Sequence, residues 1–369
     1  MKKRFLRDIA EIQTGPFGSQ LHKEDYVDAG TPIVTVEHLG NRVFSEQNLP
    51  MVSDADKSRL SKYVLKEGDI VFSRVGSVDR CSFVDQKHDG WMFSGRCLRV
   101  RPSEEVDPLF LYYFFCLNTT KEFVRSIAVG ATMPSINTKL LGEVEVVCLE
   151  IEEQRKIADI LSKIDDKIEE NQKINENLEQ QAQAIYCDMF ITNANPSWQL
   201  GRLSDLITVR YGKDHKKLAD GIYPVYGSGG VMRYVEKPLY DKESVLIPRK
   251  GTLNNVMYVN KPFWSVDTMF FTEMKLPNVA KFVFHFVKSK DLASLNAGSA
   301  VPSMTTDILN AMELLIPDAD TFYKFENIVA PLYQAMQQNT RESSKLAELR
   351  DSLLPRLMSG ELDVSSIDL

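Results

Sequence analysis

The feature that most constrains the fold of this chain is an internal repeat. Residues 130–138 read G-A-T-M-P-S-I-N-T and residues 298–306 read G-S-A-V-P-S-M-T-T, at an offset of 168 residues. The Gly, the Pro, the Ser and the final Thr are identical in the two segments. The strand-like runs V-E-V-V at 144–147 and M-E-L-L at 312–315 keep this offset. The spacing predicts two copies of one lobe rather than a single domain.

Two looser matches extend the repeat toward the start of each lobe. The segments are G-D-I-V-F-S-R-V-G at 68–76 and E-S-V-L-I-P-R-K-G at 243–251, and both are apolar strands that end in Arg-x-Gly. The lobe openings, L-R-D-I at 6–9 and L-S-D-L at 203–206, also match. The offset changes along the lobe, which indicates loops of different length on a shared framework. Variable loops on a repeated framework are typical of recognition surfaces.

A long helix is predicted after each lobe. Residues 152–191 contain neither Gly nor Pro, and their apolar positions alternate in steps of three and four, as in a coiled coil. The first seam consists of Ile157, Leu161, Ile164, Ile168, Asn171, Asn175, Leu178, Ala182, Ile185 and Met189. Adding 168 gives a second seam of Phe325, Val329, Leu332, Met336, Asn339, Ser343, Leu346, Arg350, Leu353 and Leu357. Both seams are polar at their centre.

Chain direction predicts how these helices pair. The first leads from lobe one to lobe two and the second leads back, so we expect an antiparallel pair with a pseudo-two-fold axis near the polar centre. Asn175 should then lie opposite Asn339, and Asn171 opposite Ser343. Pro331 is expected to kink or interrupt the second helix. The alternative is two unrelated amphipathic helices that pack on separate lobes.

The predicted fold class is α/β (mixed α+β), with two similar globular domains separated by two long antiparallel coiled-coil helices. We place lobe one at residues 1–150, the first helix at 151–192, lobe two at 193–318, and the second helix with the C-terminal tail at 319–369. The second lobe is the smaller of the two.

The charge of the chain is concentrated on the helices. The net charge is −7, of which residues 151–192 carry −5 and residues 319–369 carry −3. The two lobes together therefore carry +1, so local basic surfaces on them remain possible. No apolar run approaches the length of a membrane span, and the basic start lacks the pattern of a signal peptide, so we expect a cytoplasmic protein. The five cysteines lack metal-site spacing and are expected to be buried thiols.

Three segments resemble the DNA-specificity subunit of type I restriction–modification enzymes. They are the Arg-x-Gly strand at 68–76, the helix opening E-Q-R-K-I-A-D-I-L at 153–161, and the closing segment L-A-E-L-R-D-S-L-L-P-R-L-M-S-G-E-L at 346–362. The last segment is the most specific, and the resemblance covers the whole chain in the expected order. Pro248 stands where the first copy has Ser73, which is a departure within the second strand.

This resemblance implies a DNA-binding protein without catalysis of its own. Each lobe would be a target-recognition domain that reads one half of a split sequence in double-stranded DNA. The helices would set the spacing of the half-sites and dock two methyltransferase subunits, and nuclease/translocase subunits would join the full complex. No cofactor or metal is expected in this chain, whereas S-adenosylmethionine is expected in the methyltransferase partner. No membrane partner is implied.

DNA contacts are expected from polar and basic loop residues, because Lys, Arg, Ser and Thr meet phosphates while Arg, Asn, Gln and Lys read base edges. In lobe one we select Gln13, Thr14, Ser19, Gln20, His22, Lys23, His38, Asn41, Arg74, Ser77, Arg80, Thr132, Ser135, Asn137 and Lys139. In lobe two we select Arg210, Tyr211, Lys213, His215, Lys216, Lys217, Tyr226, Ser228, Arg249, Lys250, Thr252, Asn254, Asn255, Ser299, Ser303, Thr305 and Thr306.

Each of these groups has a structural alternative. The basic segment at 210–217 is equally consistent with a solvated loop, and the hydroxyls of the two Pro-Ser turns with turn capping. The aromatic runs at 110–115 and 282–287 are interpreted as buried helix faces rather than base-stacking platforms.

Enzymatic motifs are weak. N-P-S-W at 195–198 superficially resembles the Asn-Pro-Pro-aromatic motif of adenine methyltransferases, but no Gly-rich cofactor loop accompanies it. G-P-F-G-S at 15–19 lacks the ending of a phosphate loop and is interpreted as a turn, with a backbone approach to phosphate as the alternative. Pro317, Asp318, Asp320 and Lys324 lack the spacing of a metal nuclease. A standalone enzyme and a protein-binding scaffold that never touches DNA are the competing hypotheses.

Overall fold

The computed structural model describes residues 2–16, 18, 20–40, 42–295 and 303–364. The chain forms two compact units. Unit 1 consists of residues 1–170 and 342–369, and unit 2 consists of residues 171–341. Each unit therefore contains one lobe together with one part of each long helix, α6 (Ile151–Cys187) and α10 (Ala319–Met358). A single π-helical turn, Asp188–Thr192, continues α6.

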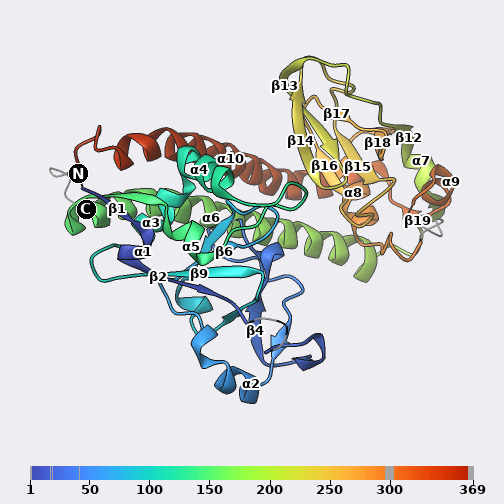
Figure 1. Ribbon diagram of the computed structural model, residues 1–369. Helices are drawn as coiled ribbons and strands as arrows, with labels where there is room; N and C mark the ends of the chain where they lie inside the picture. The colour runs from blue at the N-terminus through green and yellow to red at the C-terminus, as the bar shows by residue number, and fades with distance from the viewer. Residues whose placement is uncertain (1, 17, 19, 41, 296–302, 365–369) are drawn as a thin grey trace. The chain divides into compact units, whose positions relative to one another are not determined.

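Lobe one is a mixed structure of short strands and helices (Figure 1). Its strands are β1 (Lys2–Phe5), β2 (Ala10–Thr14), β3 (Tyr26–Val27), β4 (Thr31–Val34), β5 (Met51–Val52), β6 (Ile70–Ser73), β7 (Cys81–Phe83), β8 (Met92–Phe93), β9 (Cys97–Pro102) and β10 (Glu145–Cys148). Its helices are α1 (Leu6–Ile9), α2 (Asp54–Arg59), α3 (Pro108–Cys116), α4 (Asn118–Ile127) and α5 (Thr138–Gly142).

Lobe two has a closely similar order of elements. Its strands are β11 (Gln199–Arg202), β12 (Ile207–Tyr211), β13 (Asp220–Gly227), β14 (Gly230–Val235), β15 (Ser244–Pro248), β16 (Met257–Val259), β17 (Trp264–Ser265), β18 (Met269–Met274) and β19 (Glu313–Ile316). Its helices are α7 (Leu203–Leu206), α8 (Ala280–Lys288) and α9 (Thr306–Asn310).

The strand pairing confirms the internal repeat. Lobe one contains an antiparallel sheet of order β2-β9-β6-β7, and lobe two contains one of order β12-β18-β15-β16. The ribbon β1–β10 corresponds to β11–β19, and the parallel pair β4–β8 corresponds to β13–β17. The copies differ beyond this frame, because β4 also pairs with the two-residue β5, whereas β13 pairs with the longer β14.

Each lobe has its own hydrophobic core. The side chains of β6 and β15 are buried at every position, and such strands are stable only when both faces of the sheet are covered. Helices α3 and α8 cover one face, since their buried aromatic side chains share a cluster with Ile70 of β6 and Ile247 of β15. The smaller sheet of each lobe covers the other face, where Val71 and Leu246 lie in a second cluster. The interpretation of both aromatic runs as core is therefore confirmed.

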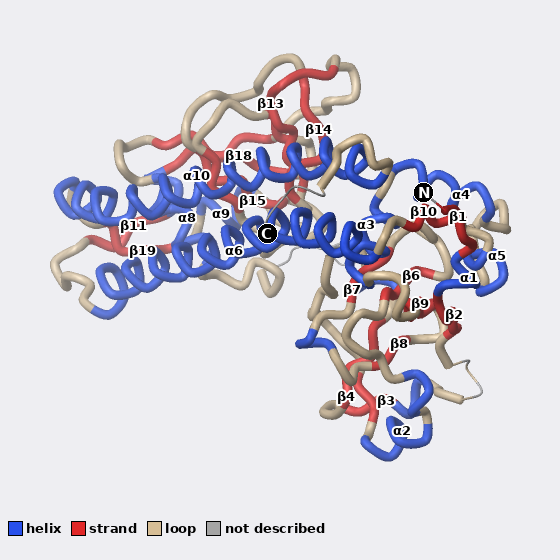
Figure 2. The backbone as a smooth tube through the Cα atoms, turned by 90° about the vertical axis from the view of Figure 1, so that its left-hand side faces the viewer, coloured by secondary structure: helices blue, strands red, loops and turns tan. Residues whose placement is uncertain are grey.

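The helical seam is part of both cores. In unit 1, Ile157 and Leu161 of α6 are buried with Leu354 and Leu357 of α10. In unit 2, Ala182 and Tyr186 of α6 are buried with Phe325 and Val329 of α10. The other predicted seam side chains are buried or half-buried: Ile164, Ile168, Asn171, Asn175, Leu178, Ile185, Met189, Leu332, Met336, Asn339, Ser343, Leu346, Arg350 and Leu353. In unit 2, Asn171 bonds to Asn339 and Asn175 bonds to Met336, so the two helical segments are antiparallel (Figure 2). In unit 1, Lys156 bonds to Val364 and Asp165 bonds to Arg350, which gives the same direction.

The polar centre of the seam forms hydrogen bonds within unit 2. Asn339 donates its side-chain Nδ2 to Asn175 Oδ1 at 2.9 Å, which is the pairing that the repeat predicts. Asn175 Nδ2 in turn donates to the carbonyl oxygen of Met336 at 3.3 Å. Asn171 is almost fully buried and donates to the carbonyl oxygen of Asn339 at 3.5 Å. The pairing of Asn171 with Ser343 stays a prediction.

Pro331 was expected to kink or interrupt the second helix, and the expected interruption is wrong. Helix α10 is continuous from Ala319 to Met358 and includes Pro331. Proline removes one backbone donor, and here the buried neighbours Val329 and Tyr333 hold the helix against the core. Packing on this side therefore outweighs the local preference.

Removing one or both amides from the Asn175–Asn339 pair tests the role of the polar seam. We expect Asn339→Leu alone to lower the free energy of unfolding by about 1–2 kcal/mol, because Asn175 loses a partner. The double variant Asn175→Leu/Asn339→Leu should recover most of this loss, because two apolar side chains fill the seam. Thermal unfolding of the whole chain measures both. If the double variant loses more free energy of unfolding than the two single variants lose together, this role is contradicted.

Candidate nucleic-acid interface

The two Arg-x-Gly turns have the same geometry. In lobe one, the backbone N–H of Arg74 donates to the carbonyl oxygen of Arg96 at 2.8 Å, and its Nη1 donates to the carbonyl oxygen of Gly95 at 3.1 Å. In lobe two, the Arg249 N–H donates to Thr268 at 2.8 Å and its Nη1 to Asp267 at 3.2 Å. Each arginine thus ties the end of its strand to the turn before the neighbouring strand, β9 or β18, and both arginine residues are half-buried.

The Pro-Ser turns pack directly on the Arg-x-Gly turns. The N–H of Ile136 donates to the Arg74 carbonyl oxygen at 2.9 Å, and the N–H of Met304 donates to the Arg249 carbonyl oxygen at 2.9 Å. The corresponding bridges are Val75–Ser135 and Lys250–Ser303. The two segments that define the sequence repeat are therefore neighbours in each lobe, although they are more than 50 residues apart in the chain.

A third loop joins this pair at a glycine. The N–H of Gly15 donates to Cys97 at 3.2 Å, and the N–H of Gly212 donates to Met269 at 3.0 Å. A Cβ atom would lie 2.1 Å from the Ser94 carbonyl oxygen at Gly15, and 2.0 Å from the Val266 carbonyl oxygen at Gly212. Only glycine fits such a close approach. The same three loops therefore converge at the end of each sheet, and we call this arrangement the loop frame.

The loop frame of lobe two carries a group of exposed cations. Lys213, Lys216, Lys217 and Lys250 are exposed, and the Arg249 guanidinium lies 5.4 Å from the centroid of the half-exposed Tyr211 ring. This combination of Lys, Arg and an aromatic ring suits phosphate and base contacts. Arg210 is also exposed, but it pairs with Glu273 at 3.0 Å, and His215 is half-buried.

Several polar residues selected in lobe two brace the loops. Asn255 Nδ2 donates to the Ser228 carbonyl oxygen at 2.7 Å, and Asn254 Nδ2 donates to Asp291 at 3.0 Å. The Thr305 hydroxyl accepts from the N–H of Ile308 at 3.3 Å, so it caps α9. Thr252 is exposed, whereas Ser228, Ser303 and Thr306 are half-buried.

In lobe one, the selected residues are divided between surface and turn roles. The side chains of His22, Ser77, Thr132 and Lys139 are exposed, and Arg80 is exposed while its guanidinium donates to the Leu39 carbonyl oxygen. Structural hydrogen bonds engage the rest: Gln20 accepts from Tyr63, Ser135 donates to Val129, and Asn137 caps α5. Gln13 and Thr14 are half-buried in β2.

The prediction of DNA contact is wrong for two of the selected residues, because both are buried. His38 is 2% exposed, and its Nδ1 accepts from the Thr35 N–H at 3.0 Å, so it caps a 3-10 turn. Tyr226 is 9% exposed within the second core cluster of lobe two, and burial raises its pKa to about 12. Neither side chain is available to DNA. Ser19, Asn41 and Ser299 lie outside the described residues, and only the backbone of Lys23 is described.

Arg96 is an exposed cation that the sequence reasoning missed. It occupies the turn before β9, where lobe two has Thr268. Val75 correspondingly occupies the position of Lys250, so the two lobes place their exposed cation at different points of the same frame. Arg96 also lines a concavity of about 550 Å³ together with Thr35, Glu37 and Tyr26. Aligning the turns at 94–96 and 266–268 would have revealed this exchange.

The weak enzymatic motifs have structural roles. Asn195 Oδ1 accepts from the N–H and the hydroxyl of Ser197 at 3.0 and 2.8 Å, which forms a turn after the first helix. Asp318 accepts from the N–H of Thr321 at 2.8 Å at the start of α10. Among the described residues, no group of three or more His, Cys, Asp and Glu side chains could hold a metal ion.

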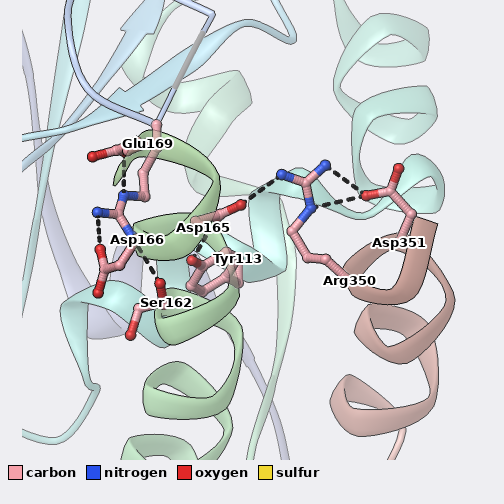
Figure 3. Close-up of polar contacts among 8 residues, drawn as sticks. Tyr113, Ser162, Asp165, Asp166, Glu169, Arg350 and Asp351 are labelled. Atoms are coloured by element: carbon pink, nitrogen blue, oxygen red, sulfur yellow. Dashed lines mark hydrogen bonds and ion pairs between the residues drawn. The ribbon is translucent and has the colours of Figure 1, made fainter. Parts of the chain in front are cut away.

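A polar network fastens lobe one to the helices within unit 1 (Figure 3). Tyr113 of α3 donates its hydroxyl to Asp165 of α6 at 2.7 Å, and Arg350 of α10 donates to the other oxygen of Asp165 at 2.7 Å. Arg42, from the loop after β4, donates to the Ser162 carbonyl oxygen at 3.2 Å and pairs with Asp166 and Glu169. Asp165 is only 7% exposed, so Arg350 compensates a nearly buried charge.

Unit 2 has a counterpart of this network with different chemistry. His285 of α8 occupies the position of Tyr113, and Tyr333 of α10 occupies the position of Asp165. The Tyr333 hydroxyl lies 2.9 Å from His285 Nε2, and Gln183 Oε1 lies 2.7 Å from His285 Nδ1. Burial lowers the pKa of His285 to about 4, with a smaller contribution from Lys288. The repeat therefore preserves the position of this contact between lobe and helix, but the contact is charged in unit 1 and neutral in unit 2.

Known proteins share this sequence pattern and this fold. The family described as the type I restriction modification DNA specificity domain matches residues 1–180 and 195–348, so the chain belongs to this family. The chain is 23% identical to the MjaIX specificity subunit of Methanocaldococcus jannaschii, over 98% of this chain and 93% of that subunit. It is 22% identical to the HindI specificity subunit of Haemophilus influenzae, over 82% and 88%.

A solved structure agrees with the architecture. The S subunit of a type I restriction–modification system from M. genitalium superposes with a TM-score of 0.59 at 20% identity, covering 96% of this chain and 95% of that one. At this identity the likeness concerns the fold. No described helix has the length and apolar character needed to cross a membrane.

The network around Asp165 predicts a large effect for one charge. We expect Arg350→Ala to lower the free energy of unfolding by about 2–3 kcal/mol, because Asp165 keeps only the Tyr113 hydroxyl in a nearly buried site. The matched control is Arg356→Ala, whose partner Glu361 is exposed, and it should cost less than about 1 kcal/mol. Urea unfolding compares them, and equal losses would argue against the network.

His285 predicts a pH dependence of unit 2. The folded pKa lies near 4, whereas an unfolded histidine titrates near 6.5, so the unfolded chain binds the proton first. The contribution of His285, up to about 3 kcal/mol, is present above pH 6.5 and is lost as the pH falls toward 4. Hydrogen exchange of α8 amides at pH 7 and pH 5 measures this loss, and His285→Gln should reduce it. An unchanged pH dependence in the variant would contradict the assignment.

Proposed function

We propose that this chain is the DNA-recognition and scaffold subunit of a type I restriction–modification complex. Each lobe binds one half of a bipartite, asymmetric target in double-stranded DNA. The observation that carries this proposal is the loop frame, which repeats in both lobes with the same backbone hydrogen bonds but with different exposed side chains. The membership of the specificity family supports it.

The loops rather than the helices are proposed to meet DNA. The helical segments carry net charges of −5 and −3, which disfavour contact with a polyanion, whereas lobe two exposes lysines at its loop frame. The helices are proposed to set the spacing between the half-sites and to dock two methyltransferase subunits. These subunits would bind S-adenosylmethionine and transfer the methyl group, and nuclease/translocase subunits would join for restriction. This chain contributes recognition and not catalysis.

The competing hypotheses predict different behaviour. A standalone nuclease or methyltransferase would act without partners, and a pure protein scaffold would show no preference among duplexes. The test is a salt-titrated binding assay of the chain with purified methyltransferase subunit on a randomised duplex library. We expect selection of one split sequence and a steep loss of affinity with salt. Equal binding to all duplexes would exclude the proposal, and turnover by the chain alone would restore the enzyme hypothesis.

The lysines of lobe two give a quantitative prediction. If Lys216 and Lys217 contact phosphates, Lys216→Ala and Lys217→Ala should each reduce the slope of log affinity against log salt by about 1, without changing the selected sequence. The matched control is Lys261→Ala, an exposed lysine elsewhere in lobe two that should leave the slope unchanged. Slopes equal to that of the unmodified complex would remove these two lysines from the interface.

A further inference from the structure

The β13–β14 hairpin of lobe two presents an unusual apolar surface. Ile222 is 77% exposed and Met232 is 61% exposed, and Tyr234 and Val231 beside them are also exposed. A few scattered apolar side chains on a surface are ordinary, but this group lies on one pair of strands. In lobe one the corresponding strands β4 and β5 have only four and two residues, so the long hairpin belongs to lobe two alone.

Two irregularities in the pairing of β13 with β14 expose these side chains. Asp220 and Tyr223 both face Val235, so Gly221 and Ile222 are additional residues on β13. Val225 faces Arg233 and Tyr226 faces Val231, so Met232 is an additional residue on β14. Bulges redirect side chains and increase the twist of a ribbon, and they are common beside functional sites. The two most exposed apolar side chains of the hairpin are thus the bulged ones.

The outer part of this hairpin is a two-stranded ribbon (Figure 2). Strand β17 pairs only with Val225 and Tyr226, and among the described strands residues 220–224 pair with β14 alone. Paired strands lie about 5 Å apart, and the major groove of B-DNA, about 12 Å wide, accommodates a two-stranded ribbon. Ile222 and Tyr234 lie on this two-stranded part, and Met232 lies at its base, opposite the residues of β13 that also pair with β17.

Exposed cations flank the ribbon. The loop that carries Lys213, Lys216 and Lys217 is tied to β14, because Arg233 donates to the Leu218 carbonyl oxygen at 2.9 Å. Arg233 forms an ion pair with Asp220 at 2.9 Å, so the lysines of this loop are the cations that remain to contact phosphates. At the other end, the turn at Ser228 bonds to Asn255 of the Arg-x-Gly loop. The hairpin that carries the exposed apolar side chains is therefore joined to the proposed DNA-binding loops at both ends.

We propose that the bulged β13–β14 ribbon enters the major groove of the half-site read by lobe two. Ile222, Met232 and Tyr234 contact base edges there, and the flanking lysines bind phosphates. The apolar contacts select thymine, because its 5-methyl group is the apolar feature of the major groove. This inference rests on the proposed function and adds the element and the chemistry by which one lobe reads its sequence.

A site-specific cross-linker identifies the occupant of the surface. A benzophenone amino acid replaces Met232 in the chain assembled with the methyltransferase subunit and the selected duplex. We expect a cross-link to DNA within the half-site of lobe two. A cross-link to the methyltransferase subunit instead would overturn the proposal and assign the hairpin to protein docking.

Variants then test the base preference. Ile222→Ser and Met232→Ser should relax the selected sequence in one half-site only, and replacing a contacted thymine by uracil should weaken the unmodified complex roughly fourfold, as expected for one buried methyl group. The uracil effect should disappear in Met232→Ser if Met232 holds that methyl group, or in Ile222→Ser if Ile222 does. Leu276→Ser, an exposed apolar side chain of lobe two away from the hairpin, is the matched control.

The outcomes separate this inference from the proposed function. If the unmodified complex selects a split sequence but neither variant changes the preference, the ribbon proposal is wrong while the proposed function stands. A half-site of lobe two without thymine has the same consequence. If the unmodified complex selects no sequence, the proposed function itself fails, and the ribbon proposal fails with it.

Discussion

The hydrogen bonds around Arg74 and Arg249 are the constraint on which both proposed recognition surfaces depend. Each arginine uses its own N–H and one guanidinium nitrogen to hold two carbonyl oxygens of the neighbouring turn, and its carbonyl oxygen accepts from the Pro-Ser turn. These bonds involve the backbone of every partner. The loops therefore keep their places whichever side chains the partners carry, which leaves the remaining positions free to vary.

This arrangement explains why the same arginine is a poor guide to DNA contacts. Arg74 and Arg249 were selected from the sequence as candidate DNA contacts, yet each guanidinium donates to the protein itself. In lobe two the exposed cation is Lys250, the residue after Arg249. In lobe one it is Arg96, which lies in the neighbouring turn that Arg74 holds. A repeated residue marks the frame, and the residues that differ between the copies are the ones that can distinguish two half-sites.

The sequence predicted the architecture well because that architecture rests on periodic and repeated features. The offset of 168 residues located matching strands and turns, and the alternating apolar steps located both helices and the Asn175–Asn339 pair. Individual side chains were less predictable. His38 and Tyr226 are polar residues near loops, but tertiary packing buries them, and no local pattern signals this burial. Asp165 and Arg350 lie far apart in sequence, so their contact depends on the paired helices.

The repeat preserves positions more strictly than chemistry. Tyr113 and Asp165 in unit 1 correspond to His285 and Tyr333 in unit 2, so a charged anchor in one copy becomes a neutral one in the other. Strand β13 begins with a bulged ribbon, whereas its counterpart β4 begins by pairing with the two-residue β5. A duplication that fixed both the frame and the surface would favour two identical half-sites. Because only the frame is fixed here, the same fold can present two different surfaces, and this difference supports the proposal of an asymmetric target.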